Sequence, residues 1–540
     1  MPRRKLRVKA ADSARINTEL AELRARLEIR TEWPEEVLAE AEEAAERPRL
    51  PGYDATELPL FTVDPPGSRD LDQAMHLSHR PGGGYRVHYA IADVAAFVRP
   101  GRAIDAEARR RVETLYFPDH RVPLHPARIS EDAASLLPGE PRPALLWQLD
   151  LDADGAVVLA DVRRALVRSH RRLDYAAVQR AVDLGGADEQ LALLAVIGRL
   201  REEQERARGG ISLPVPEQEV EETLHGYVLG YRAPTPADGW NAQISLLTGM
   251  AAAELMLDAG VGLLRTLPAA PAAGYDRLRR IAAALDVDWP KDLPYPELVR
   301  SLDPGAPLDA AFLNACTGLL RGAGYQAFDE SRGLPAPAEP GHAALAAPYA
   351  HCTAPLRRLG DRFAQEVCAA VAAGEDVPDW AREALPAVPA LMASGDRRAA
   401  EVERACVDLV EAELLAGREG EEFSAVVIEV DAHRPGSGTV QLREPAVRAR
   451  CDRAVGPADG TPGPVGGVGT GTPVGTPGPV GGVGTGTPVG TPGPVGGVGT
   501  DTQAGPERAA AAPPLPLGRV IDVRLTKADP ATRTVRFSAV

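Results

Sequence analysis

The spacing of apolar residues predicts two helices near the start of the chain. Between residues 13 and 29, apolar side chains recur at intervals of four, three and four residues, as on one face of an amphipathic helix, at Ile16, Leu20, Leu23 and Leu27. A second helix is expected from Pro34, because proline suits a first turn and Glu35 and Glu36 lie at the positive end of the helix dipole. We expect residues 1–57 to form a small helical unit with a basic arm. The pattern leaves open whether this unit is a helix-turn-helix.

Helical and alternating patterns are mixed between residues 58 and 416. The segment 85–91 alternates between polar and apolar side chains, which indicates a strand. Residues 174–208, 241–265 and 394–416 have helical periodicity. Strands and helices do not alternate regularly, so a doubly wound parallel sheet is not expected. The predicted fold class is α+β, with residues 58–416 as one large mixed domain.

The last part of the chain predicts a small β-barrel with a long insertion. Four strand-like segments lie at residues 423–430, 439–442, 518–525 and 534–537. Between the second and the third, a 15-residue unit of Gly, Pro, Thr and Val begins three times, at Thr461, Thr476 and Thr491. Such a unit has too little apolar surface to pack. We therefore expect residues 456–513 to be a flexible insertion in an OB-fold barrel made of residues 417–455 and 514–540.

Composition favours a folded protein with local, not general, attraction for phosphate. The 540 residues are 44% hydrophobic, which is enough for a packed core. A formal net charge of −16 argues against a surface coated in basic charge, although a local basic channel stays possible. Five cysteines without CxxC spacing exclude a disulfide framework and a zinc ribbon. With no secretory signal and no 18-residue apolar run, the sequence predicts a cytoplasmic protein that spans no membrane.

The first candidate for chemistry is an acidic turn that follows an apolar strand. Asp64, Asp70 and Asp72 fall within nine residues, and Gln73 comes next. Like charges this close repel one another, and a divalent cation relieves that repulsion most directly. A pair of such ions can assist an in-line attack on a phosphodiester. The turn alone fits a solvated acidic loop equally well.

The second candidate is a pair of neighbouring arginines, Arg357 and Arg358. Adjacent guanidinium groups can present planar forks to phosphate. It is equally compatible with the pattern that one arginine pairs with Asp361 while the other is solvated. His351 and Cys352 also stand side by side, but no further ligand accompanies them, so a metal or thiol-nucleophile site is not expected there.

Taken together, these segments resemble the ribonuclease II / ribonuclease R family of 3′→5′ exoribonucleases, specifically its catalytic RNB domain. The resemblance covers residues 58–415 and rests on six motifs in the family's order. The motifs lie at residues 64–72, 91–94 with 98–101, 115–118 with 122–124, 135–136 with 138–139, 168–170, and 349–362. The C-terminal barrel resembles the family's S1 domain, which grips single-stranded RNA.

The resemblance implies a metal-binding role for the acidic turn. Asp64, Asp70 and Asp72 match the family's acidic cluster, which holds magnesium and the scissile phosphate, and Asp72 matches its most critical member. Gln73 stands where the family carries a fourth aspartate. Its amide oxygen can still coordinate magnesium, with manganese as the alternative ion, but one charge fewer should weaken binding.

The resemblance also implies an RNA-binding set. Arg357 matches the arginine that contacts phosphate at the reacting end, and Tyr116 matches the tyrosine that stacks on the terminal bases, a core aromatic being its alternative reading. Glu403 matches a glutamate near the 3′ end, unless it belongs to a solvated helix face. Arg358 and Tyr349 complete the predicted substrate-binding residues. Further phosphate-binding candidates are Arg163, Arg164, Arg168, Arg171 and Arg172.

Two further positions depart from the family, and both bear on rate and product length. Leu213 replaces an aromatic residue that would sandwich bases opposite Tyr116, and Ala242 stands where the best-known bacterial member has glutamate. The segment before Asp64 is also too short for the two cold-shock barrels that relatives usually carry there.

The sequence thus predicts a processive or semi-processive, magnesium-dependent 3′→5′ exoribonuclease. It would hydrolyse single-stranded RNA to 5′-nucleoside monophosphates as a cytoplasmic monomer. The alternative is a catalytically weakened RNA-binding adaptor of the same family, of which Gln73 would be the mark. A DNA-binding regulator built on the N-terminal helices would not explain the acidic turn.

Overall fold

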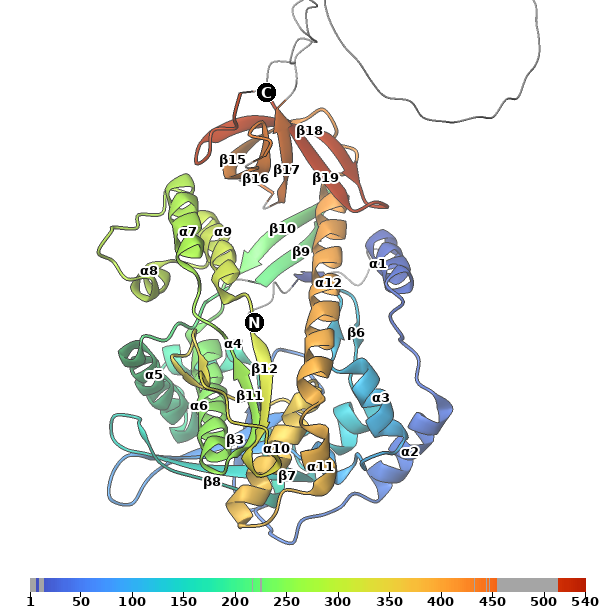
Figure 1. Ribbon diagram of the computed structural model, residues 1–540, viewed down its shortest axis with the longest axis vertical. Coiled ribbons are helices and arrows are strands. Elements are labelled where there is room, and N and C mark those ends of the chain that lie inside the picture. Colours follow the sequence, from blue (N-terminus) through green and yellow to red (C-terminus); the bar gives the residue numbers. More distant parts are fainter. Residues whose placement is uncertain are drawn as a thin grey trace, which may run out of the picture.

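The computed structural model describes most of the chain. The described residues are 6–8, 14–215, 217–223, 226–431, 433–442, 444–445, 447–453 and 513–540. The three 15-residue repeats and most of the predicted basic arm lie outside them. The molecule is elongated, with a large mixed domain below and a small barrel above, joined by one long helix (Figure 1).

The large domain is built on a closed five-stranded barrel of order β2-β3-β4-β7-β8. Its strands are β2 (Leu60–Val63), β3 (Gln73–His79), β4 (Tyr85–Ala92), β7 (Pro141–Leu151) and β8 (Val157–Leu173). The pair β2–β8 is parallel and the others are antiparallel. Neighbouring positions of β3 and β4 face two different apolar cores, with Ala74 and Ala90 in one and Met75 and Tyr89 in the other. Alternation predicted a strand at 85–91, but it did not predict that the strands close a barrel.

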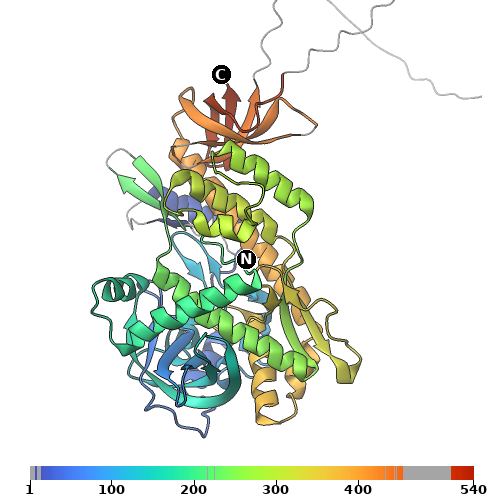
Figure 2. The same ribbon diagram turned by 90° about the vertical axis from the view of Figure 1, so that its left-hand side faces the viewer.

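Helices cover this barrel on one side (Figure 2). They are α4 (Tyr175–Asp183), α5 (Glu189–Arg208), α6 (Pro236–Asp258), α10 (Leu359–Ala373) and α11 (Asp379–Ala384). Helix α6 begins at a capping box formed by Thr235 and Asp238, with Pro236 in its first turn. It is buried along most of its length.

The structure corrects one part of the predicted helical segment 241–265. Helix α6 ends at Asp258, and β11 (Val261–Thr266) follows and pairs with β12 (Gly324–Asp329). Gly260 separates them with a φ of +67°, a conformation that glycine adopts readily and that ends a helix. The chain between these two strands forms α7 (Ala272–Ala284), α8 (Tyr295–Ser301) and α9 (Pro307–Cys316).

The two predicted N-terminal helices are present, as α1 (Ala14–Arg26) and α2 (Glu35–Glu46). They bury their apolar faces in different places. Helix α1 packs against the long helix α12 (Val388–Leu415), and α2 packs against α3 (Ala103–Arg111). The helix-turn-helix interpretation gains no support from this arrangement.

Helix α12 leads into the second closed barrel, of order β15-β16-β17-β19-β18. Its strands are β15 (Glu422–Val430), β16 (Ser437–Leu442), β17 (Arg448–Arg453), β18 (Val520–Asp529) and β19 (Thr534–Ala539). The predicted small barrel is thus present, with five strands and not the four expected. Strand β17 was missed because its sequence, Arg-Ala-Arg-Cys-Asp-Arg, lacks the apolar residues that mark a strand.

Short elements complete the described chain. They are β1 (Leu6–Val8) with β9 (Glu217–Thr223) and β10 (Gly226–Arg232), β13 (Gly341–His342) with β14 (Ala347–Pro348), and the single turns η1 (Val94–Ala96), η2 (Ile129–Ala133), η3 (Thr317–Leu320) and η4 (Glu330–Arg332). All five cysteines are buried free thiols. Among the described helices, none combines the length and the apolar character needed to cross a membrane.

Candidate active site

The acidic turn is held at both ends by the lower barrel. Asp64 comes directly after β2, and its backbone N–H donates to the carbonyl of Leu173 in β8, at 3.1 Å. Asp72 immediately precedes β3. The middle of the turn is fastened by Ser135, whose hydroxyl accepts the Leu71 N–H at 2.9 Å and donates to the Arg69 carbonyl at 2.6 Å. The barrel therefore fixes where the three carboxylates lie.

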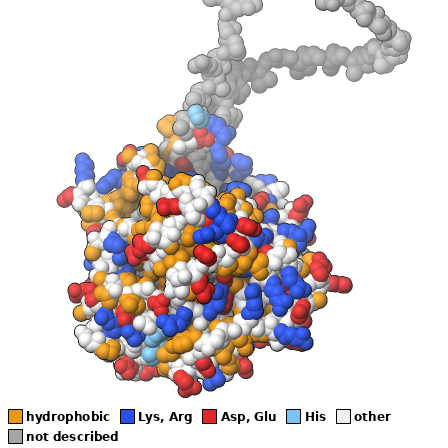
Figure 3. Space-filling model, turned by 60° about the horizontal axis from the view of Figure 1, so that its bottom comes forward, with side chains coloured by type: hydrophobic (Ala, Val, Ile, Leu, Met, Phe, Trp, Pro, Cys, Tyr) orange, Lys and Arg blue, Asp and Glu red, His pale blue; other side chains and the backbone are white. Residues whose placement is uncertain are grey.

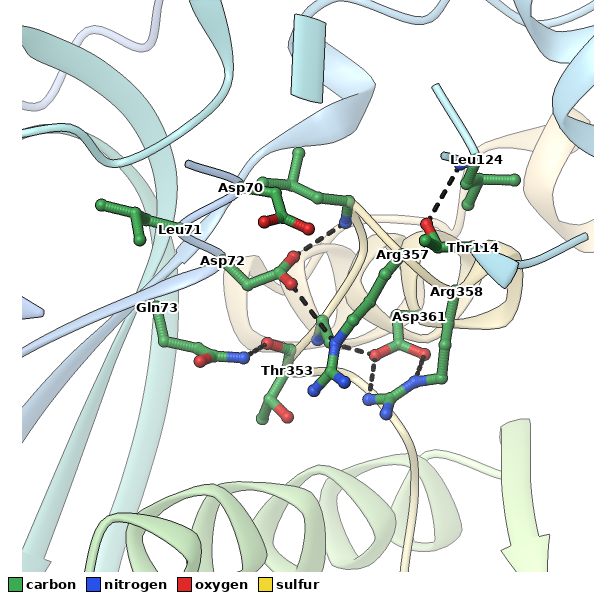
Figure 4. Close-up of polar contacts among 12 residues, drawn as sticks. Asp70, Leu71, Asp72, Gln73, Thr114, Leu124, Thr353, Arg357, Arg358 and Asp361 are labelled. Carbon is green, nitrogen blue, oxygen red and sulfur yellow. Dashed lines mark hydrogen bonds and ion pairs between the residues drawn. The ribbon is translucent and has the colours of Figure 1, made fainter. Parts of the chain in front are cut away.

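Asp72 is buried and faces the loop that precedes α10 (Figure 4). Its Oδ1 accepts the backbone N–H of Leu356 at 2.8 Å, and its Oδ2 lies 3.6 Å from Nε of Arg357. Burial raises the pKa of Asp72 well above its ordinary value, although the neighbouring Arg357 opposes that shift. The sequence put these residues 285 positions apart (357 − 72), and the fold makes them neighbours.

Asp64 carries the least satisfied carboxylate of the turn. Its Oδ2 is buried and has no hydrogen-bond partner among the residues that the structure describes. Burial, followed by the negative charge of Asp70, raises the pKa of Asp64 to about 7, while Arg357 and Arg172 act in the opposite direction. A carboxylate in this state gains most from a cation brought close to it.

The two neighbouring arginines have different surroundings. Arg358 forms two hydrogen bonds with Asp361, at 2.9 and 2.7 Å, and Asp361 also accepts the N–H of Ala354 at 2.8 Å. Arg358 is thus occupied in holding its own loop. The Arg357 side chain stays 43% exposed beside Asp72. Arg358 is thus tightly paired with Asp361, whereas Arg357 has the longer contact with Asp72 and keeps much of its side chain exposed.

Tyr116 lies on a two-stranded hairpin beside the acidic turn, formed by β5 (Leu115–Tyr116) and β6 (Arg121–Val122). Leu115 and Val122 are buried against α12, whereas Tyr116 is 51% exposed, so it is not a core aromatic. Thr114, two residues before Tyr116, donates its N–H to the carbonyl of Arg357 at 3.0 Å. This bond places the hairpin next to the arginine loop.

Glu403, Gln73 and Tyr349 are all less exposed than Tyr116. Glu403 is partly buried on α12, the helix against which the Tyr116 hairpin packs. The side-chain amide of Gln73 donates to the carbonyl of Thr353, which ties β3 to the arginine loop. Tyr349 is buried, with its ring edge-on to His351 at 5.5 Å between centroids, so it supports the loop from beneath.

The remaining positions singled out from the sequence have other surroundings. Leu213 packs partly buried beside the α7–α9 cluster, and Ala242 is exposed on α6. His351 accepts or donates a hydrogen bond at 2.6 Å with Tyr325, and burial raises the pKa of Cys352, which fits neither a metal site nor a nucleophile.

Most of the predicted phosphate-binding arginines on β8 are ion-paired within the chain. Arg163 pairs with Asp161 at 2.7 Å, Arg164 with Asp93 at 2.9 Å and with Glu366, and Arg171 with Asp188. Arg172 lies close enough to Asp64 to act on its pKa. Basic and acidic side chains also alternate over the lower face of the molecule, without a continuous basic surface (Figure 3).

Sequence reasoning missed Arg121, which contacts the acidic turn from the hairpin. Its Nη1 contacts Oδ1 of Asp70, and its Nη2 lies 2.8 Å from Oε1 of Glu131. The motif 122–124 begins one residue later, so the position was close to a recognised segment. The pairing itself carries no sequence signal, because 51 residues (121 − 70) separate the partners.

The donors of the turn suit a hard divalent cation. In the part of the chain that the structure describes, no three or more His, Cys, Asp or Glu side chains form a ready-made metal cluster. Asp64, Asp70, Asp72 and Gln73 nonetheless offer only oxygen acceptors, and the orphaned Oδ2 of Asp64 and the raised pKa values mark negative charge that lacks compensation. Magnesium prefers a few such oxygens together with water and phosphate. The residues present fit such an ion.

Two known domain families match this chain. Residues 53–373 match the RNB domain, and residues 421–465 and 508–540 match the RNase II-type exonuclease C-terminal S1 domain. The second match comes in two pieces, and most of the repeat segment lies between them. The chain therefore belongs to the RNB family and ends in an S1-type barrel.

Known relatives are longer than this chain. Ribonuclease R of Escherichia coli is 30% identical over 355 residues, which cover 61% of this chain and 42% of that protein. The chain spans between 33% and 42% of the length of the first curated relatives that it matches.

Solved structures share the fold. Mycoplasma genitalium RNase R, in complex with ribose-methylated single-stranded RNA, matches with a TM-score of 0.73 and 16% identity, over 97% of this chain and 78% of that one. Yeast Ssd1, described as a pseudonuclease, matches with a TM-score of 0.55 and 17% identity, over 76% of this chain and 51% of that one. The fold thus occurs in proteins with and without nuclease activity.

Proposed function

We propose that the protein is a 3′→5′ exoribonuclease that hydrolyses single-stranded RNA to 5′-nucleoside monophosphates, in RNA degradation or processing, with magnesium as its cofactor. One observation carries the proposal. The acidic turn, the arginine loop and the Tyr116 hairpin come from remote parts of the chain, yet Arg357 lies beside Asp72 and its loop is hydrogen-bonded to Thr114 at the base of the hairpin. These groups are the ones that phosphodiester hydrolysis at an RNA end requires.

Each residue has a defined task in this mechanism. Asp64, Asp70 and Asp72, with the amide oxygen of Gln73, would hold the cation, which when bound supplies an activated water and charge neutralisation. Arg357 would donate hydrogen bonds to the phosphate oxygens on which negative charge develops. Its exposed guanidinium can do so, because Arg358 and not Arg357 pairs with Asp361.

The RNA end would be held by the hairpin and its neighbours. The half-exposed ring of Tyr116 offers a face on which a terminal base can stack, and such stacking tolerates any sequence. Glu403, which α12 carries, would lie near the 3′ end of the RNA. Arg358 and Tyr349 support the arginine loop from within the protein, so their contribution to RNA binding is through Arg357.

The second candidate is a non-catalytic RNA-binding adaptor. Gln73 supplies one charge fewer than an aspartate at the same place, and Asp70 is already neutralised by Arg121. Both features lower the affinity for a cation. An adaptor would bind RNA through the same surfaces and release no nucleotide.

A decay assay with RNA labelled at its 3′ or its 5′ end distinguishes the two candidate functions. We expect immediate mononucleotide release from 3′-labelled single-stranded RNA in magnesium and none in chelator. Asp72→Asn should lower the rate at least about 100-fold, the scale on which single electrostatic groups act in active sites. Its fold should persist, because an asparagine Oδ1 can still accept the Leu356 N–H.

The matched control is Asp161→Asn, which removes a carboxylate paired with Arg163 on the outside of β8. It should decay RNA at the wild-type rate. Wild-type-like decay by Asp72→Asn would refute the assignment of the site. Intact RNA that only shifts in a gel would establish the adaptor instead.

A further inference from the structure

We propose that Arg121 is a positioning residue that holds Asp70 in place of a cation while the protein is free of RNA. Metal affinity then stays low until an RNA phosphate offers Arg121 another partner. The inference rests on the proposed function, because Asp70 is one of the carboxylates assigned there to the metal. It adds a control on when that carboxylate becomes available.

The geometry joins three elements through one guanidinium. Arg121 in β6 lies directly opposite Tyr116 in β5, and the turn between them is closed by the Phe117 N–H, which donates to the His120 carbonyl at 2.8 Å. From this hairpin Arg121 reaches Asp70 on the acidic turn and Glu131 on η2. Its planar fork suits two carboxylates at once.

The Arg121–Asp70 ion pair is partly buried, but it is still accessible from solvent. The side chains of Arg121, Asp70 and Glu131 are 28%, 15% and 22% exposed, respectively. Water therefore screens the pair only in part, while phosphate and cation can both reach it. A cation that takes Asp70 must displace or share this guanidinium, so Arg121 and the cation compete for the same oxygens.

The hairpin explains why RNA would change this balance. A base stacked on Tyr116 brings its phosphate to the strand that carries Arg121, because the two residues are direct partners in the hairpin. Arginine binds phosphate as readily as carboxylate. Arg121 keeps Glu131 as a second partner, so it can leave Asp70 without losing its place.

The test measures manganese binding to the purified full chain, by electron paramagnetic resonance, without catalysis. In the absence of RNA, Arg121→Gln should bind Mn²⁺ about fivefold more tightly than the wild type, as expected for loss of a partly exposed ion-pair competitor. With a non-hydrolysable single-stranded RNA analogue, the difference should fall below about twofold. A merely structural role would weaken Mn²⁺ binding, because a loosened site holds its ligands less well.

Arg24→Gln is the matched control, because Arg24 pairs with Asp119 of the same hairpin at 2.7 Å and does not contact the acidic turn. It should leave Mn²⁺ affinity unchanged. Arg121→Lys, which keeps the charge but not the fork, should lie between wild type and Arg121→Gln, and it serves if Arg121→Gln does not fold. If the wild type binds Mn²⁺ and degrades RNA but the Arg121 variants bind Mn²⁺ no more tightly than it does, the inference is wrong. If the wild type neither binds Mn²⁺ nor degrades RNA, the proposed function itself fails.

Discussion

Asp64 and Asp72 show how a candidate site residue can be recognised by what it lacks. Asp72 and the Oδ2 atom of Asp64 are buried, and among the described residues the charges that compensate them are those of arginines, of which Arg357 lies 3.6 Å from Asp72. The spacing of the turn predicted that these aspartates need a partner. The burial that makes the need acute could not be predicted, because it depends on which segments cover the turn.

The raised pKa of Asp64 predicts a pH-dependent stability in the absence of metal. The folded state holds this proton up to about pH 7, compared with 3.8 for an ordinary aspartate, so the contribution of Asp64 to stability becomes less favourable as the pH rises through that interval. In chelator, Asp64→Asn should raise the free energy of unfolding at pH 8 by about 1–3 kcal/mol, and by less at pH 5. Thermal melting at both pH values checks this. An equal shift at the two pH values would show that Asp64 does not titrate in this range.

Magnesium gives the complementary measurement. It should raise the melting temperature of the wild type at pH 8, where Asp64 is ionised, more than at pH 5. The same addition should have a smaller effect on Asp64→Asn.

Helix α10 illustrates how an element outside the site keeps the site in place. It starts two residues after Arg357, and its buried Arg362 donates to Asp105 of α3 at 2.6 Å and to the Val98 carbonyl at 2.9 Å. Sequence reasoning included Arg362 in a motif but could not assign it a task, because its partner is 257 residues away. Helix α5 and most of α12 were predicted, because the helical signal is local. The closure of the lower barrel and strand β17 were not predicted, because strand pairing depends on distant segments.

Breaking the Asp105–Arg362 pair should be costly. Asp105→Ala leaves a buried guanidinium without its carboxylate, and we expect a loss of about 3–5 kcal/mol in the free energy of unfolding. Asp161→Ala, which breaks the more exposed pair with Arg163, should cost less than about 1 kcal/mol. Urea unfolding measures both. Replacing both buried partners, as Asp105→Leu with Arg362→Met, should recover much of the loss. Equal losses of stability in Asp105→Ala and Asp161→Ala would contradict this account.

At the scale of the whole molecule, the upper barrel closes although its sequence is divided. Its matched residues stop at 465 and resume at 508. The two described ends stay together, because Arg453 at the end of β17 donates to the carbonyls of Pro513 and Pro514, at 3.2 and 3.1 Å. The barrel was predicted from its strands, whereas the contact that joins its two halves was not.

Deleting residues 461–500 should therefore leave the protein almost unchanged. Shortening a long connection alters the closure entropy by well under about 1 kcal/mol, and the contacts of Arg453 lie outside the deleted residues. The melting temperature should move by less than about 3 °C, and RNA decay by less than about twofold. A barrel that no longer folds in this deletion would show that the repeats are part of its structure.

The long helix α12 sets the spacing between the Tyr116 hairpin and the upper barrel. Cys406 shares an apolar cluster with Leu115 of the hairpin, and Leu415 belongs to the core of the upper barrel, nine residues (415 − 406) further on. At 1.5 Å per residue this spacing is about 14 Å, or roughly four nucleotides of a strand stacked at 3.4 Å each. Under the proposed function, an RNA shorter than that would not reach from the Tyr116 hairpin to the upper barrel. We therefore expect the length at which the protein releases its substrate to depend on α12, the helix that also carries Glu403.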